Sequence, residues 1–198
     1  SGSDSQDASS QAPSAGASSP ASSDAPPAEE GTPLVIGAAV AKSGFLAPFD
    51  TPALATLEYS IEQVNAAGGI AGRPVELQVI DTKSDRELAA TAAQDLIGAG
   101  AELIVTTCDF EFGAPAALVA EENDVVAIAP CSSDAKFGPR GIGPLSFSMG
   151  TANITEGAVM AKFAVENQGW KTAYVLTDTS VTYTKGMCPA FSQRFTEL

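Results

Sequence analysis

Two short polar segments, each directly after an apolar run, contain the side chains best suited to binding chemistry. Each combines hydroxyl, thiol and carboxylate groups: Thr106, Thr107, Cys108 and Asp109 in the first segment, and Cys131, Ser132, Ser133 and Asp134 in the second. Such groups donate and accept hydrogen bonds, and a carboxylate adds a charge, so together they can hold a small polar molecule. The absence of histidine from the chain excludes a Ser-His or Cys-His nucleophile pair at either segment.

The stretch 101–134, which contains both polar segments, has the pattern of a βαβ unit. Its apolar runs at 103–105 and 125–128 are continuous rather than alternating, which is typical of parallel strands covered on both faces. A helix-like segment at 111–123 separates the two runs, as the crossover between parallel strands requires. Because ligands of open α/β sheets bind outside the carboxyl ends of the strands, the pattern predicts a small-molecule site at these two tips.

Strand and helix patterns alternate along the rest of the chain. We expect Asp50 or Thr51 to cap the first helix, and Ser84 and Glu87 to form a capping box at the second. This alternation predicts the α/β class with a doubly wound parallel sheet. The expected strands cover 34–40, 75–80, 145–149 and 172–177, and the expected helices cover 51–67, 84–99, 153–168 and 185–198.

Residues 1–33 differ in composition from everything that follows. They are rich in Ser, Ala and Pro, carry five acidic residues, and include no aromatic residue and no Lys or Arg. Such a segment buries too little apolar surface to offset the entropy of ordering, so we expect a disordered linker. It is interpreted either as an artificial linker or as a tether that holds a folded domain away from a cell surface. No signal peptide is expected, so either the protein is intracellular or Ser1 is a processed start.

Charge and composition exclude several classes of function. The net charge of −14 argues against nucleic-acid binding and against docking on an anionic membrane surface. The cysteines at 108, 131 and 188 have no zinc spacing, and the acidic residues of 109–122 do not form a calcium loop, so no metal site is expected. The GGIAG segment at 68–72 follows a helix rather than a strand, so no dinucleotide or other cofactor is predicted.

Several motifs together resemble those of one family. They are IGAAVAKSG at 36–44, NAAGGIAGRPVELQVID at 65–81, GAGAELIV at 98–105, TTCD at 106–109 and APCSSD at 129–134. This set resembles the substrate-binding proteins of ABC transporters, in particular the leucine/isoleucine/valine-binding type with the type I periplasmic-binding fold. The resemblance covers residues 34–198, and the N-x-x-GGI-x-G block followed by a strand ending in Asp is its most specific part.

The resemblance implies two α/β lobes with a ligand held between them. Residues 34–148 would form lobe one and residues 149–198 the start of a truncated lobe two. Implied too is an extracytoplasmic protein, in the periplasm or at the cell surface, with a possible N-terminal lipid anchor as its only membrane attachment. It would capture an amino acid or related amine or amide and deliver it to an ABC permease, without catalysis. A ligand-binding sensor ectodomain of the same fold is the alternative, and an enzyme on a doubly wound sheet is disfavoured by the absence of histidine.

Site residues follow from the resemblance position by position. Phe49 would pack on the ligand, and Tyr183 would close over it from lobe two. The tip at Cys131, Ser132 and Ser133 would bind a carboxylate of the ligand through hydroxyl and backbone N–H groups.

Asp109 departs from the family pattern, which has a serine at this place. A carboxylate here would repel a ligand carboxylate and attract an ammonium or an amide N–H. One hypothesis is therefore a cationic amino acid, an amide or a polyamine as ligand. The other is that Asp109 only caps the following helix and faces away from the pocket.

The cysteines leave two interpretations open. Members of the family often have a disulfide from the 81–85 loop to the position of Cys108, but Ser84 replaces the first partner here. Because Cys108 and Cys131 follow neighbouring parallel strands, we predict a disulfide between them in an oxidising compartment. Two free buried thiols are the alternative.

Overall fold

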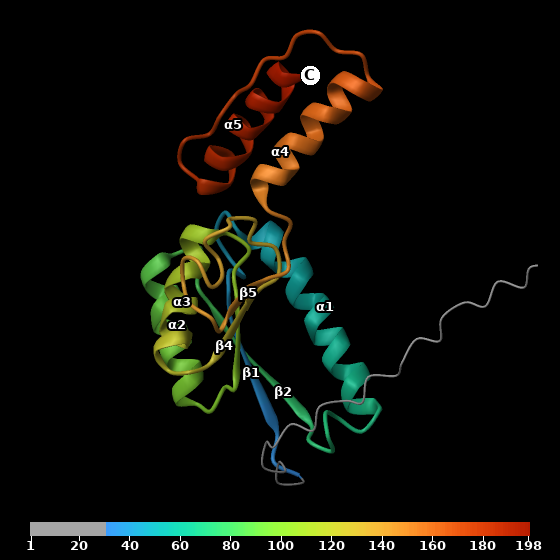
Figure 1. The fold of residues 1–198 in the computed structure, drawn as a ribbon. Coiled ribbons are helices and arrows are strands. Elements are labelled where there is room, and N and C mark those ends of the chain that lie inside the picture. The colour runs from blue at the N-terminus through green and yellow to red at the C-terminus, as the bar shows by residue number, and fades with distance from the viewer. Residues whose placement is uncertain (1–30) are drawn as a thin grey trace, which may run out of the picture.

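One parallel sheet forms the centre of the computed structural model, which describes residues 31–198 (Figure 1). Within these residues its five strands lie in the order β2-β1-β3-β4-β5. The predicted α/β fold with a doubly wound parallel sheet is confirmed, whereas the predicted disordered segment 1–33 lies almost wholly outside the described residues. The strands are β1 (Leu34–Val40), β2 (Val75–Asp81), β3 (Leu103–Thr106), β4 (Val126–Ala129) and β5 (Ser146–Ser148).

Helices cover both faces of this sheet (Figure 1). On one face, α1 (Ala47–Ala66) packs Leu54 and its apolar neighbours against β1, β2 and β3. On the other face, α2 (Arg86–Gly98) and α3 (Phe110–Glu122) bury a second cluster that includes Leu96. Two apolar clusters explain why the strands read as continuous apolar runs, because both sides of each strand are removed from water.

Helix α1 begins earlier than the capping pattern predicted. Its first residue is Ala47, and Leu46 occupies the N-cap position. Asp50 is instead buried, with 2% of its surface exposed, and accepts hydrogen bonds from the N–H groups of Ala41 (2.7 Å) and Cys108 (2.9 Å). The predicted cap was wrong because this carboxylate satisfies two backbone donors that burial would otherwise leave without partners.

The predicted capping box of Ser84 and Glu87 is not formed at α2. Asp85 is the N-cap, and its carboxylate accepts from the N–H groups of Glu87 and Leu88 at 2.8 and 3.0 Å. The Ser84 hydroxyl accepts from the N–H of Leu46 at 3.0 Å. Ser84 therefore ties the loop after β1 to the start of α2, and the neighbouring aspartate takes the capping role.

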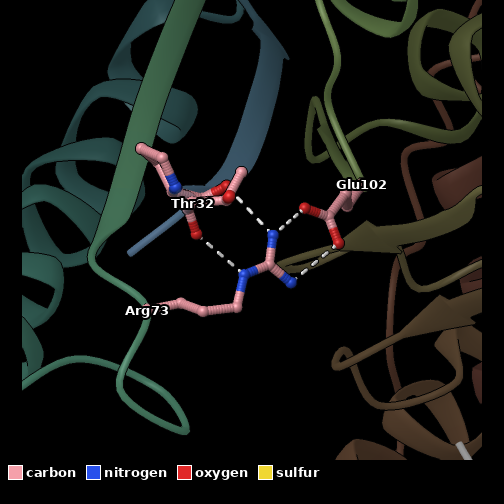
Figure 2. A network of polar contacts seen from close by, with 4 residues as sticks. Thr32, Arg73 and Glu102 are labelled. Carbon is pink, nitrogen blue, oxygen red and sulfur yellow. Dashed lines mark hydrogen bonds and ion pairs between the residues drawn. The ribbon is translucent and has the colours of Figure 1, made fainter. Parts of the chain in front are cut away.

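A polar network lies at the amino-terminal ends of the strands (Figure 2). Arg73, just before β2, donates from Nε to the carbonyl of Thr32 at 2.9 Å and from Nη2 to that of Pro33 at 3.0 Å. Its guanidinium also forms an ion pair with Glu102, just before β3, which raises the pKa of Arg73. One side chain thus connects the segments that lead into β1, β2 and β3, at the end of the sheet opposite the polar tips.

Two further helices lie beyond the carboxyl ends of the strands (Figure 1). They are α4 (Asn153–Lys162), which continues into a π-helical turn η1 (Phe163–Asn167), and α5 (Thr182–Glu197). The predicted strand at 172–177 is absent, because a strand needs a partner for its ladder and none pairs with it within residues 31–198. In the described part of the chain, no helix is both long and apolar enough to cross a membrane.

Candidate ligand-binding site

A cavity of about 510 Å³ lies at the carboxyl ends of β3 and β4. This is where open α/β sheets bind ligands, and the volume is that of a small-molecule site. Its lining comes from the loop after β1 with the start of α1, from the two strand tips, and from the residues around the start of α5. The lining residues are Phe45, Leu46, Phe49, Cys108, Asp109, Phe110, Cys131, Ser133, Asp134, Asp178, Val181 and Tyr183.

The structure brings together five of the six residues predicted to bind the ligand, which are Phe49, Asp109, Cys131, Ser133 and Tyr183. Phe49 and Tyr183 lie in the first turns of α1 and α5, which begin earlier than the helices predicted at 51–67 and 185–198. The side chains come from segments that are far apart in the chain but meet at one end of the sheet. Their contact with a ligand remains a prediction.

Ser132 is the predicted site residue that does not line this cavity. Its side chain is buried, with 1% exposed, and lines a separate cavity of about 300 Å³ together with Ser146. Neither hydroxyl has a hydrogen-bond partner among the described residues. Ser133 and Asp134 line both cavities, so the two cavities adjoin at the tip after β4, and Ser132 contributes only to the smaller one.

A disulfide joins Cys108 and Cys131, whose Cα atoms are 4.7 Å apart. Of the two interpretations left open by the sequence, the structure contains the bridged one. The bond connects the tips of two neighbouring parallel strands, and both cysteines line the cavity. Cys188, in α5, is a buried free thiol. The cavity wall is therefore covalently closed between β3 and β4.

Asp109 combines two roles that the sequence suggested as alternatives. It is the N-cap of α3, where its carboxylate accepts from the N–H of Glu111 at 2.9 Å, and it also lines the cavity. Burial raises the pKa of Asp109 to about 6, and the nearby carboxyl group of Glu111 adds to this rise. The cavity thus contains a carboxyl group that ionises less readily than one in water.

Glu111 connects this strand tip to the start of α5. It accepts a hydrogen bond from the Thr182 N–H at 2.6 Å and another from the Thr182 hydroxyl. Partial burial acts to raise the pKa of Glu111, but these hydrogen bonds outweigh burial and lower it. Glu111 therefore stays ionised, and it fixes the first N–H of α5 to the sheet side of the cavity.

Glu156, on α4, is a contributor that the sequence did not reveal. Its two carboxylate oxygens accept from the Ser133 hydroxyl at 3.3 Å and from the Tyr183 hydroxyl at 2.8 Å. Burial and the adjacent Glu156 carboxylate raise the pKa of Tyr183. Residues on opposite sides of the cavity thus donate to a single carboxylate, although nothing in the spacing of the residues around Glu156 indicates this.

Phe45 and Phe110 add aromatic surface to the cavity. Phe45 also packs edge-on against Phe112, with ring centroids 5.1 Å apart and an interplanar angle of 80°. In the sequence, the one feature that pointed to Phe45 was its position a few residues before Phe49, after the first predicted strand. For Phe110 it was the position directly after the polar tip that ends at Asp109.

Comparison with known proteins identifies the family. A family model described as periplasmic binding protein matches residues 33–198. Among curated relatives, Leu/Ile/Val-binding protein homolog 3 of Brucella melitensis is 27% identical over 158 residues, which are 80% of this chain and 42% of the relative. The leucine-, isoleucine-, valine-, threonine- and alanine-binding protein of Pseudomonas aeruginosa is 29% identical over 119 residues, 60% of this chain and 32% of the relative. The chain spans less than half the length of these two relatives.

Solved structures agree with this assignment. The branched-chain amino acid transporter substrate-binding protein LivJ of Streptococcus pneumoniae, in complex with isoleucine, superposes with a TM-score of 0.78 at 24% identity, covering 83% of this chain and 47% of LivJ. The leucine-binding protein LivK of Thermotoga maritima gives 0.70 at 26% identity, with 83% and 46% covered. The resemblance inferred from the motifs is confirmed: this chain belongs to the periplasmic binding protein family.

Proposed function

We propose that this chain belongs to an extracytoplasmic solute-binding protein that captures an amino acid or a related amine or amide between two lobes. Residues 34–148 form lobe one in this proposal, and residues 149–198 form the start of lobe two. The observation that carries the proposal is the cavity of about 510 Å³ at the carboxyl ends of β3 and β4, lined from both parts of the chain. Its size suits a solute of amino-acid dimensions.

Both lobes contribute side chains to the capture of the solute. From lobe one, Phe49 supplies apolar surface, and Asp109 and Ser133 supply polar groups, while Tyr183 approaches from lobe two. The hydrogen bond that Glu156 accepts from Ser133 crosses between the lobes, and the one that it accepts from Tyr183 lies within lobe two. These contacts support a mechanism in which the lobes close on the solute by rotation about the connecting segment.

Delivery of the bound solute to an ABC permease is the second part of the proposal. It is supported by the family and by relatives described as substrate-binding proteins of a branched-chain amino acid transporter. The protein acts outside the cytoplasm, at the cell surface or in the periplasm. Attachment through a lipid near the N-terminus fits the Ser/Ala/Pro-rich composition of the first 33 residues, which suits a tether.

A thermal-shift panel tests solute capture. It uses the protein in the full length that its gene encodes, with amino acids, their amides, and mono- and polyamines as candidate solutes. A solute present at 100 times its dissociation constant adds about 2.7 kcal/mol of stability, a shift of several degrees. If no member of the panel raises the melting temperature, the proposal is contradicted.

A matched pair of variants shows whether the shift arises at this cavity. Phe49 and Tyr59 both lie on α1 and both have 62% of their surface exposed, but only Phe49 lines the cavity. We expect Phe49→Ala to reduce the solute-induced shift and Tyr59→Ala to leave it unchanged. Equal shifts in the two variants place the solute elsewhere.

A further inference from the structure

The cavity wall is negatively charged. Three carboxylate side chains line the cavity, Asp109, Asp134 and Asp178, and no Lys or Arg is among the lining residues, all of which are described. Hydrogen bonds from the hydroxyl and N–H of Ser180 lower the pKa of Asp178, which keeps this group ionised. A ligand carboxylate placed among these groups would meet repulsion without a compensating cation.

The hydroxyl groups of the cavity do not correct this imbalance. A hydroxyl has a single proton to donate, and those of Ser133 and Tyr183 are both directed to Glu156. What these residues have left for a ligand is oxygen lone pairs, which only accept hydrogen bonds. The polar side chains of the cavity are therefore acceptors, and they match a ligand group that only donates.

At two helix N-termini, the usual backbone sites for an anion, one N–H group already donates to a carboxylate of the protein. At the start of α3, Asp109 accepts the N–H of Glu111, and at the start of α5, Glu111 accepts the N–H of Thr182. The partial positive charge of each helix end is thus paired with a carboxylate of the protein itself. A ligand carboxylate at either position would therefore lie beside a carboxylate of the protein.

Aromatic rings supply the remaining surface. Phe45, Phe49, Phe110 and Tyr183 line the same cavity, and aromatic faces attract organic cations while packing against their apolar parts. Within residues 31–198, no three His, Cys, Asp or Glu side chains are grouped closely enough to hold a metal ion. The distribution of charge therefore fits an extended organic cation better than a small inorganic one.

We propose that the solute is an organic amine recognised through its ammonium group, rather than a branched-chain amino acid held by its carboxylate. This inference rests on the proposed function and specifies the solute class for that same cavity. The ammonium pairs with Asp109 in a wall that Asp134 and Asp178 make negative, and the carbon skeleton packs on the phenylalanine rings. An ion pair with the bound ammonium offsets the cost of burying the Asp109 carboxylate beside Glu111.

Four compounds built on one carbon skeleton test the solute charge directly. They are 3-methylbutylamine, leucinamide, leucine and 4-methylpentanoate, which differ in the presence of the ammonium and the carboxylate; putrescine and spermidine extend the series to longer cations. Isothermal titration calorimetry on the full product of the gene measures each affinity. We expect the amines to bind at least roughly tenfold more tightly than leucine, because the carboxylate of leucine would lie among like charges, and we expect 4-methylpentanoate not to bind.

Charge-neutralising variants identify the groups responsible. Asp109→Asn keeps a preferred N-cap residue, so α3 is retained while the charge is lost. Asp124→Asn removes an equal charge at an exposed turn after α3, where the residue has φ +57° and Asn is well tolerated. We expect the first variant to weaken amine binding roughly tenfold to hundredfold and the second to leave it unchanged.

The outcomes separate this inference from the proposed function. Tighter binding of leucine or 4-methylpentanoate than of the amines overturns the amine assignment and leaves solute capture standing. Equal amine affinity in Asp109→Asn and the wild-type protein also overturns it. Binding of no compound in this series or in the wider panel contradicts both. Amine binding that depends on Asp109 and not on Asp124 supports both.

Discussion

Glu111 of α3 accepts a hydrogen bond of 2.6 Å from the backbone N–H of Thr182, 71 residues further along the chain. Thr182 is the first residue of α5, so the contact joins the sheet region to the C-terminal helices. A helix begins with N–H groups that have no partner inside the helix. Here a carboxylate from another element provides one, and its lowered pKa shows that the charged form is stabilised in return.

Removal of this carboxylate should weaken the fold. We expect Glu111→Ala to lower the free energy of unfolding by about 1–3 kcal/mol, because the N–H of Thr182 loses a charged partner. Urea denaturation measures the change. Glu122→Ala, an exposed glutamate at the other end of α3, should stay within about 0.5 kcal/mol of the wild-type protein. Equal losses in the two variants mean that the contact to α5 does not contribute.

The disulfide between Cys108 and Cys131 gives a second prediction. It closes a loop with a sequence separation of 23 residues, and restriction of the unfolded chain by a loop of this length corresponds to roughly 3 kcal/mol. The double variant Cys108→Ser, Cys131→Ser should therefore unfold with about 2–4 kcal/mol less free energy. Dithiothreitol should destabilise the wild-type protein and have no effect on the double variant.

Counting thiols by mass provides an independent measurement of the bridge. The chain contains three cysteines, of which only Cys188 is free in the structure. Alkylation in denaturant without a reductant should add one label, on Cys188, and alkylation after reduction should add three. Three labels before reduction would show that Cys108 and Cys131 are free thiols.

The raised pKa of Asp109 makes stability depend on pH in a defined direction. Burial and Glu111 raise this pKa from its ordinary value of 3.8 to about 6, so between these values the folded protein binds a proton that the unfolded chain has lost. The contribution of Asp109 to the free energy of unfolding therefore falls as pH rises from about 4 to about 6, and it changes no further above that. Asp109→Asn removes this contribution. The free energy of unfolding of the variant should therefore rise relative to that of the wild-type protein between about pH 4 and about pH 6.

Other acidic groups lie near Asp109, so the comparison has to isolate one carboxyl. Glu111 lies beside it, Asp134 and Asp178 line the same cavity, and the lowered pKa of Glu111 has the opposite effect on stability. Chemical denaturation at several pH values should show the stability of Asp124→Asn running parallel to the wild-type curve. A difference between Asp109→Asn and wild type that is flat from pH 4 to pH 7 would refute the assignment.

The strands and helices that were predicted correctly depend on residue types within their own segment of the sequence. The continuous apolar runs of β1 and β3 report burial on both faces, and this burial depends on residue types within each run. The βαβ pattern then places Cys108 and Cys131 on neighbouring strands, which was sufficient to suggest their pairing. The parallel direction of the strands follows from the same pattern, because crossover helices impose a parallel sheet.

The incorrect predictions all depended on a tertiary partner. Asp50 has a residue type suited to a helix cap, but distant N–H groups of the loop after β1 and of Cys108 occupy its carboxylate. Residues 172–177 have the composition of a strand, but a strand forms only beside another strand. Glu156 joins the site through contacts to Ser133 and Tyr183, and its own neighbourhood in the sequence contains no sign of them.

The packing of α2 against β1 depends on the small size of Gly37, in the middle of that strand. A methyl group at this position would lie 2.9 Å from Cβ of Leu96 and 3.0 Å from Cβ of Ala101, closer than carbon atoms pack. Gly37→Ala should therefore destabilise the protein by about 1–3 kcal/mol through overpacking.

Gly98→Ala is the matched control, because nothing lies within 4 Å of the added methyl group. Replacing Gly98 restricts only the unfolded chain, so we expect the free energy of unfolding to rise by about 0.4–1 kcal/mol. Thermal unfolding of the two variants should shift in opposite directions, and a stabilised Gly37→Ala variant would show that α2 does not lie this close to the sheet.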